Sequence, residues 1–279
     1  MTTVSPEKIR RITVALDASA SSLAALEAAI ELAVQWGAEV EGLFVEDVDL
    51  LRWASLPFAT EVGHHSGEFR KQNRPEVERQ LQALAERAHA HLRHAAERRR
   101  VRASFRKVQG NVVRALRAAF AEADLVTLGR GERPRTIPSG LGSTARALAA
   151  GRRGLVFVIS HRVRLASPVA VLFEDSAAGH RALGLAMDVA HRNAQPLAIV
   201  TAGQKREIPP EVRSRAEHDS VEVRTYHVRR EDPSRVAAVA HEMGAGILVL
   251  SAEHFSSEAI EEAATAFPGA LLLVGHSGP

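Results

Sequence analysis

Residues 125–131 read Leu-Val-Thr-Leu-Gly-Arg-Gly, and residues 139–144 read Ser-Gly-Leu-Gly-Ser-Thr. The apolar run that opens the first segment is typical of a buried strand in a parallel sheet. After Gly142, Ser143 or Thr144 can cap a helix, whose free N–H groups and positive dipole end would then face the tip of the strand. A strand, a glycine loop and a helix N-terminus form a common anion-binding arrangement. The same residues also fit an ordinary strand-to-helix turn.

The composition is that of a globular protein. The chain has 279 residues, 46% of them hydrophobic, and a formal net charge of +3. This length predicts one or two domains with real hydrophobic cores. The absence of cysteine excludes disulfides, thiol catalysis and thiolate metal ligands. No run approaches a membrane span, and residues 1–11 lack the apolar core of a signal peptide. We expect a cytoplasmic protein that binds neither nucleic acid nor membrane.

Strand-like and helix-like patterns alternate in the first part of the chain. An apolar, irregular segment at 50–74 interrupts them, which predicts a flap or a packed excursion beside a site. The alternation itself predicts a doubly wound parallel sheet. We expect strands at 12–17, 40–45, 101–108, 125–128 and 155–159, and helices that end near Gly37, open at Pro75 and cover 112–120.

The first strand and helix recur later in the chain. Positions with the same residue lie 157 apart: Val14 and Val171, Ser19 and Ser176, Leu26 and Leu183, Ala33 and Ala190. Residues 124–129 match 246–251 at a shift of 122, so the second copy is 35 residues shorter in between. Further strands are expected at 197–201, 221–228 and 270–274. The pattern predicts an internal duplication, with domains at 1–162 and 163–279.

The second copy lacks the features of the opening stretch. Its strand is followed by Ser251-Ala252-Glu253-His254, with no glycine pair and no Gly-Ser before the last helix. Glu253 would place a carboxylate where a phosphate would lie. Only the first copy is therefore a candidate anion site.

Common nucleotide and nucleic-acid motifs are absent. No Gly-Lys pair exists, which excludes a Walker loop, and Pro134 stands where the third glycine of a dinucleotide fingerprint belongs. The arginines at 98–100 fit a solvated helix end better than a nucleic-acid patch, because no aromatic residues interleave with them.

Metal and nucleophile chemistry is not favoured either. His89, His91 and His94 do not share one helix face, and His64 and His65 have no further ligand nearby, so surface histidines are the preferred interpretation. We find no nucleophile elbow and no carboxylate pair of enforced geometry.

Several motifs together resemble a known family. They are Val14-Ala15-Leu16-Asp17 with Ser19, Gly-Leu-Phe-Val-Glu-Asp at 42–47, Gly110, Gly129-Arg130-Gly131 and Gly142-Ser143-Thr144. The chain resembles a tandem universal stress protein with a degenerate second domain. The resemblance implies an α/β fold of two doubly wound parallel-sheet domains in tandem, Rossmann-like and similar to the adenine nucleotide alpha hydrolases.

The resemblance also implies a site. Family members that bind ATP place an aspartate near the ribose and base and a valine in the adenine pocket, and Asp17 and Val45 match these positions. The phosphate loop of the family reads glycine, two residues, glycine, nine residues, glycine, then serine or threonine. Gly129, Gly142 and Ser143 match this spacing. The implied binding residues are Asp17, Val45, Gly129, Arg130, Gly131, Gly142, Ser143 and Thr144.

One position departs from the family pattern. Glu132 stands where the middle glycine belongs, and Gly131 lies one residue early. A carboxylate beside a triphosphate weakens binding through like-charge repulsion. Arg130, Arg133 and Arg135 could offset this repulsion, or Gly131 could take over with a local shift.

The resemblance implies a stress-response protein that binds ATP or a related adenine nucleotide, with Mg²⁺ as its counter-ion, and acts by binding and regulation. At most, slow ATP hydrolysis is expected. The alternative is a nucleotide-free interaction module that uses the tandem domains as a scaffold for an unknown protein partner. An enzyme of nucleotide transfer is disfavoured, because no general base or metal-ligand cluster is visible.

Assembly follows from the repeat. Each copy ends in a short apolar strand, at 155–159 and 271–274, which cannot stay bare without risking aggregation. Single-domain relatives form a two-fold dimer through this last strand, so the resemblance implies that the two strands pair antiparallel and make the chain a pseudo-dimer. A homodimer of whole chains would need another surface.

Overall fold

The computed structural model describes residues 8–54, 60–62, 69–71, 74–131, 142–150, 154–160, 165–203, 208–229, 232–253 and 255–275. We call residues 8–160 the first half and residues 165–275 the second half. The first half contains β1 Arg11–Leu16, α1 Ala20–Trp36, β2 Glu39–Asp47, α2 Val48–Ala54, β3 Thr60–Val62, β4 Phe69–Lys71, α3 Arg74–Arg99, β5 Ala103–Gly110, α4 Val112–Ala119, β6 Leu125–Gly129, α5 Gly142–Ala150 and β7 Leu155–Ile159. The second half contains β8 Val169–Phe173, α6 Ala177–Arg192, β9 Leu197–Ala202, α7 Pro210–His218, β10 Val223–Val228, α8 Pro233–Glu242, β11 Ile247–Ser251, α9 Ser257–Ala266 and β12 Ala270–Val274.

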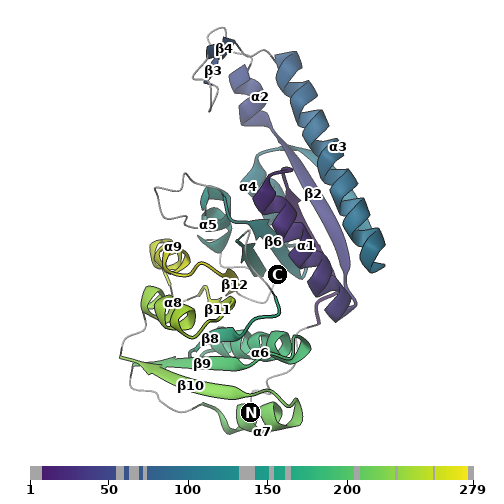
Figure 1. The fold of residues 1–279 in the computed structure, drawn as a ribbon. Coiled ribbons are helices and arrows are strands. Elements are labelled where there is room, and N and C mark those ends of the chain that lie inside the picture. Colours follow the sequence, from purple (N-terminus) through teal and green to yellow (C-terminus); the bar gives the residue numbers. More distant parts are fainter. Residues whose placement is uncertain are drawn as a thin grey trace.

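Ten strands form one continuous sheet in the order β10-β9-β8-β11-β12-β7-β6-β1-β2-β5 (Figure 1). Neighbouring strands within each half are parallel. From the centre outward, the first half reads β7, β6, β1, β2, β5 and the second half reads β12, β11, β8, β9, β10. Both halves thus have their last strand at the centre, followed by the strand before it and then by the three earlier strands in chain order. The first strand of each half therefore lies inside the sheet, as the predicted doubly wound topology requires.

The two halves join through β7 and β12, which pair antiparallel, with Phe157 opposite Leu272. Every residue of both strands is buried. This contact confirms the predicted pairing, and it turns two apolar edges that would invite aggregation into the middle of a sheet.

Helices cover both faces of the sheet. Apolar side chains of α1, α3, α6 and α7 form one core with the residues that point to that face. Those of α4, α5, α8 and α9 form a second core on the opposite face. Because each core runs across both halves, the join between them is packed on both sides.

The internal repeat is visible in local structure. Ser19 and Ser176, 157 positions apart, are the N-caps of α1 and α6, and each side chain accepts a hydrogen bond from the N–H three residues on. Such caps satisfy N–H groups that have no partner within the helix. α1 ends at Gly37, whose φ of 66° lies in the left-handed region that glycine adopts without strain.

The halves differ where the sequence predicted a shorter second copy. The first half inserts α2, the antiparallel pair β3–β4 and the long helix α3 between β2 and β5, whereas the second half has only α7. α2 contacts α3, and both extend beyond the body of the sheet at the top of Figure 1. Side chains of this segment are described at 48–53 and 74, and none of them lines the pocket analysed below. The expectation that the excursion lies beside a site stays a prediction.

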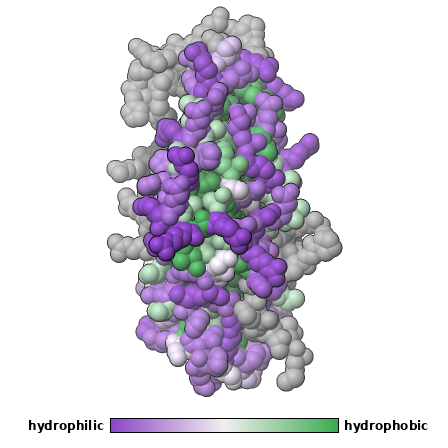
Figure 2. All heavy atoms as spheres, turned by 90° about the vertical axis from the view of Figure 1, so that its right-hand side faces the viewer, coloured by the Kyte–Doolittle hydropathy of each residue, from purple (hydrophilic) through white to green (hydrophobic). Residues whose placement is uncertain are grey.

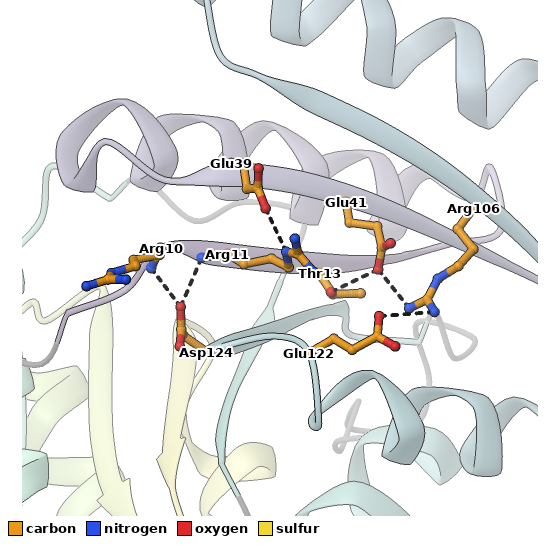
Figure 3. Close-up of polar contacts among 8 residues, drawn as sticks. All are labelled: Arg10, Arg11, Thr13, Glu39, Glu41, Arg106, Glu122 and Asp124. Atoms are coloured by element: carbon orange, nitrogen blue, oxygen red, sulfur yellow. Dashed lines mark hydrogen bonds and ion pairs between the residues drawn. The ribbon is translucent and has the colours of Figure 1, made fainter.

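Polar side chains fix the amino-terminal ends of the first-half strands (Figure 3). Arg11 donates to Glu39 on the paired strand, with 2.7 Å between Nε and Oε1. Arg106 of β5 donates to Glu41 at 2.8 Å, and Asp124 accepts the N–H of Arg11 at 3.0 Å. These contacts tie β1, β2, β5 and the start of β6 together at the edge opposite to the strand ends that carry the pocket.

The molecular face in Figure 2 is mainly hydrophilic, with scattered hydrophobic side chains. None of the helices that the structure describes is both long and apolar enough to cross a membrane.

β6 approaches the start of α1 very closely at Gly129. A Cβ atom built on Gly129 would lie 2.4 Å from the carbonyl carbon of Ser21 and 2.6 Å from the backbone nitrogen of Ser22. Backbone atoms cannot yield in the way a flexible side chain can. A Cβ atom built in the same way on Gly131, two residues on, would have no atom within 4 Å.

This contrast gives a first prediction. Gly129→Ala should lower the free energy of unfolding by about 1–3 kcal/mol, because α1 and β6 must move apart to admit the methyl group. Gly131→Ala is the matched control and should change it by less than about 0.5 kcal/mol. Urea denaturation of the two variants measures the difference. Equal stability would contradict the observed close approach.

The β7–β12 contact gives a second prediction. Phe157→Asp, alone or with Leu272→Asp, should lower the free energy of unfolding by about 3 kcal/mol or more, because each substitution buries an unpaired carboxylate. Val34→Asp introduces the same group at a position that is 50% exposed and should have little effect. Denaturant titration with size-exclusion chromatography follows stability and compactness. A double variant that stays compact and equally stable would show that the strands do not meet.

Candidate functional site

A pocket of about 500 Å³ opens at the carboxyl-terminal ends of β1, β2 and β6. β1 is the strand at which the order of the first half reverses direction, since β2 lies on one side of it and β6 on the other. Crevices at such points are the usual ligand sites of open α/β sheets. The lining residues are Ala15, Leu16, Asp17, Ser19, Ser21, Ser22, Leu43, Val45, Val112, Leu116, Leu128, Gly129, Gly131, Thr144, Ala145 and Arg146.

One wall of the pocket is the turn from β1 into α1. Oδ1 of Asp17 accepts the N–H of Ser19 at 2.9 Å, and the N–H of Asp17 donates to Oγ of Ser22 at 3.4 Å. Between them, buried Ala18 has a φ of 61°, a conformation that costs a residue other than glycine about 1 kcal/mol or more. The turn holds Asp17 exposed at the pocket mouth, and Oδ2 of this carboxylate makes no hydrogen bond with the described residues.

The floor of the pocket is apolar. Leu43 and Val45 come from β2, Val112 and Leu116 from α4, and Leu128 from β6. Leu43, Leu116 and Leu128 are buried. Such a floor suits a flat, weakly polar ring more than a charged group. Val45, which the family resemblance assigns to the adenine pocket, lies on this floor.

The opposite wall is polar and glycine-rich. Gly129 ends β6, exposed Gly131 follows two residues later, and Thr144 and Arg146 come from the first turns of α5. Arg146 was missed by sequence reasoning, which followed the family spacing and stopped at Thr144. Its guanidinium adds positive charge near the N-terminal end of α5, where the helix dipole already favours an anion.

The helix boundary corrects one expectation. α5 begins at Gly142, so Ser143 and Thr144 lie within its first turn rather than capping it. Gly142 and Ser143 nevertheless lie at the end of the helix that faces the pocket. Glu132, Arg133 and Arg135 lie outside the described residues.

Arg130 requires a second correction. The sequence placed it among the phosphate ligands, but its side chain is buried and points into the second half. Nη1 donates to the carbonyls of Ala264 and Phe267 at 3.1 and 3.0 Å, and Nη2 donates to that of Gly269 at 3.2 Å. The backbone N–H donates to the carbonyl of Ile159 at 2.7 Å. These bonds occupy Arg130, and it cannot offset a carboxylate at the pocket.

The environment of Arg130 also explains its pKa. Burial lowers the pKa of its guanidinium to about 10, and the negative charge of Glu261 partly opposes this shift. A pKa near this value leaves the group protonated at neutral pH, so it is a buried cation held by carbonyl oxygens.

The second half places different residues at the corresponding positions. Ser251, Ala252 and Glu253 stand in place of Gly129, Arg130 and Gly131. A Cβ on Gly179 of α6 would lie 2.0 Å from the carbonyl oxygen of Glu174, the counterpart of Asp17, so helix and turn are tightly packed there.

Histidines do not gather into a metal site in the part of the chain that the structure describes, which holds no group of three or more suitable ligands. His89 instead stacks on Phe105, with ring centroids 4.7 Å apart. His64 and His65 lie outside the described residues.

Known proteins share this architecture. The model of the universal stress protein family matches residues 8–152. A universal stress protein from Archaeoglobus fulgidus DSM 4304 covers 96% of this chain and 96% of its own, with a TM-score of 0.71 and 16% identity. A functionally unknown protein from Pseudomonas aeruginosa PAO1 covers 95% and 92%, with a TM-score of 0.60 and 14% identity. A universal stress protein in complex with cAMP covers 56% and 99%, with a TM-score of 0.37 and 18% identity. No curated protein matches the chain.

The first two structures share the fold of both halves. The family match covers more than half of the chain and includes every residue that lines the pocket. The chain belongs to the universal stress protein family.

Proposed function

We propose that this chain is a stress-response protein that binds ATP or a related adenine nucleotide in the pocket of its first half and acts by binding and regulation. The observation that carries the proposal is the pocket itself, which combines an apolar floor with a polar, glycine-rich rim at the switch point of the sheet.

In this proposal the adenine, the ribose and the phosphates of the ligand each contact a different side of the pocket. The adenine ring lies on the floor against Val45 and Leu116, where its faces lose water to apolar side chains. Asp17 accepts from the ribose hydroxyls through the oxygen that has no described partner. The phosphates lie along the opposite wall, at Gly129, Gly131 and the start of α5 with Gly142, Ser143 and Thr144. The described residues hold no group of three or more metal ligands, so in this proposal Mg²⁺ enters bound to the phosphates.

Arg146 strengthens the phosphate side. Its charge lies on the same helix end as Thr144, so it attracts an anion in the direction that the dipole of α5 already favours. Arg146 thus supplies positive charge on the pocket side, whereas the guanidinium of Arg130 is bonded to the second half.

The same residues support regulation rather than catalysis. Among the described residues that line the pocket, Asp17 is the one carboxylate, and none is a histidine or a lysine. Asp17 stands on the ribose side of the proposed pose, away from the phosphates. In this pose no described side chain lies beside the terminal phosphate as a base that would position and activate an attacking water molecule.

We also propose that the chain divides into a universal stress protein domain at 1–162 and a shortened, degenerate one at 163–279. The repeated strand order and the paired N-caps Ser19 and Ser176 support this division. In this arrangement one domain carries the site and the other does not, and the chain remains in the cytoplasm.

Asp17→Asn tests the nucleotide site. The amide keeps an oxygen for the N–H of Ser19 but removes the charge and one acceptor, so ATP should bind roughly 10- to 150-fold more weakly. Glu174→Gln makes the same kind of change at the counterpart in the second half and should leave the affinity unchanged. Titration calorimetry with millimolar ATP and Mg²⁺ measures both variants.

The same experiment decides between the two functions. Heat of binding for the wild type, lost in the Asp17 variant alone, supports the nucleotide site. No heat from the wild type would support the nucleotide-free interaction module, in which the tandem halves are a scaffold for another protein.

Turnover is the other prediction. Multiple-turnover ATP hydrolysis should be far slower than the median enzyme rate of about 10 per second, because charge stabilisation without a positioned base accelerates hydrolysis little. A phosphate-release assay at saturating ATP measures the rate, and a value in the enzyme range would contradict the regulatory role.

A further inference from the structure

Arg130 lies between two pocket residues in the sequence, but its side chain contacts the second half. Gly129 and Gly131 line the pocket, whereas Arg130 is only 7% exposed and its guanidinium reaches into the second half. Three carbonyls, those of Ala264, Phe267 and Gly269, accept from it.

Ala264 belongs to the last turn of α9, which ends at Ala266, Phe267 is its C-cap, and Gly269 follows in the connection to β12. The last carbonyls of a helix have no partner within it and carry the negative end of the helix dipole. The planar fork of an arginine can bond several of them at once. Figure 1 shows α9 beside α5, the helix that forms the opposite wall of the pocket, and the two are in contact.

The repeat supplies an internal comparison for this position. Ala252 corresponds to Arg130, and its N–H donates to the carbonyl of Val274 as the N–H of Arg130 donates to that of Ile159, at 2.8 and 2.7 Å. An alanine therefore suffices to continue the backbone pattern after the strand. Only the half with the pocket has a buried arginine there, although burying a cation is costly unless its donors are satisfied. Within the described structure its Nε still lacks a partner.

We propose that Arg130 is a positioning residue, which fastens the pocket residues Gly129 and Gly131 on either side of it to the C-terminal end of α9. Through this contact, the second half positions the wall of the first-half pocket that is proposed to bind the phosphates. This inference rests on the proposed function. By linkage, nucleotide binding should also stabilise the C-terminal end of α9. The Arg130 contact that strengthens nucleotide binding must itself become stronger when the nucleotide is bound.

Arg130→Met tests the inference by keeping a long stem and removing every donor. At a temperature at which the variant is fully folded, ATP should bind roughly 5- to 150-fold more weakly. Arg130→Lys keeps a cation without the fork and should recover part of the lost affinity. Ser160→Ala is the control, because Ser160 also bonds across the join, to the carbonyl of Pro268 at 2.8 Å, but does not belong to the loop. It should bind ATP as the wild type does.

A purely structural role predicts another pattern. Arg130→Met would then lower stability while the affinity for ATP in the folded protein stays at the wild-type value, and this result would overturn the inference.

Hydrogen exchange in the wild type gives a readout that needs no variant. ATP should slow exchange of the Phe267 amide, which donates to the carbonyl of Ala263, and leave that of Leu197 in the outer part of the sheet unchanged. No change at Phe267 under saturating ATP would overturn the coupling.

If the proposed function is wrong, calorimetry of the wild type with ATP gives no heat of binding, and this outcome is distinct from those above. Exchange at the Arg130 amide without nucleotide then decides the inference. It should be faster in Arg130→Met than in Ser160→Ala, and equal rates would overturn the fastening of the loop.

Discussion

The antiparallel pairing of β7 with β12 is the contact on which the other features of this molecule depend. Both strands are buried throughout, so neither half can expose its inner edge without exposing a row of apolar side chains and unpaired backbone groups. The pairing also sets the neighbours on each face. It places α9 beside α5, and it brings the last carbonyls of α9 within reach of Arg130. The join between the halves is therefore part of the surroundings of the pocket as well as the centre of the fold.

The two halves show how the same framework can carry different chemistry. Both halves have the same strand order and a serine N-cap on their first helix. In both, the N–H of the residue after the strand β6 or β11 donates to the end of the neighbouring strand. From the last residue of that strand onward, the first half has glycine, arginine and glycine, and the second half has serine, alanine and glutamate at the corresponding positions. The framework is set by burial and capping, which many side chains satisfy, whereas an anion site needs open backbone and positive charge at particular positions. The second half meets the first requirement, and its residues at these three positions do not meet the second.

Local patterns were enough to predict most of the fold. Apolar periodicity and the serine and glycine caps located the strands and helices. The two apolar terminal strands, together with the resemblance to the family, predicted the antiparallel pairing. The candidate site was less accessible to such reasoning. The side chain of Arg130 bonds carbonyls more than 130 positions away, and no local pattern reveals such a partner. Gly129 matched a phosphate motif, but its closest neighbour is the backbone of α1. Arg146 became visible only when α5 placed it at the rim.

Photoaffinity labelling tests the central claim, that the first-half pocket binds adenine nucleotide, most directly. An azido-adenine analogue of ATP reacts with whatever surrounds the base, and peptide mass spectrometry then locates the label. The account predicts labelled peptides from 39–47 or 112–128, the segments that supply the apolar floor, and loss of that label when unmodified ATP competes. Label confined to the second half, or label that ATP does not displace, would contradict it.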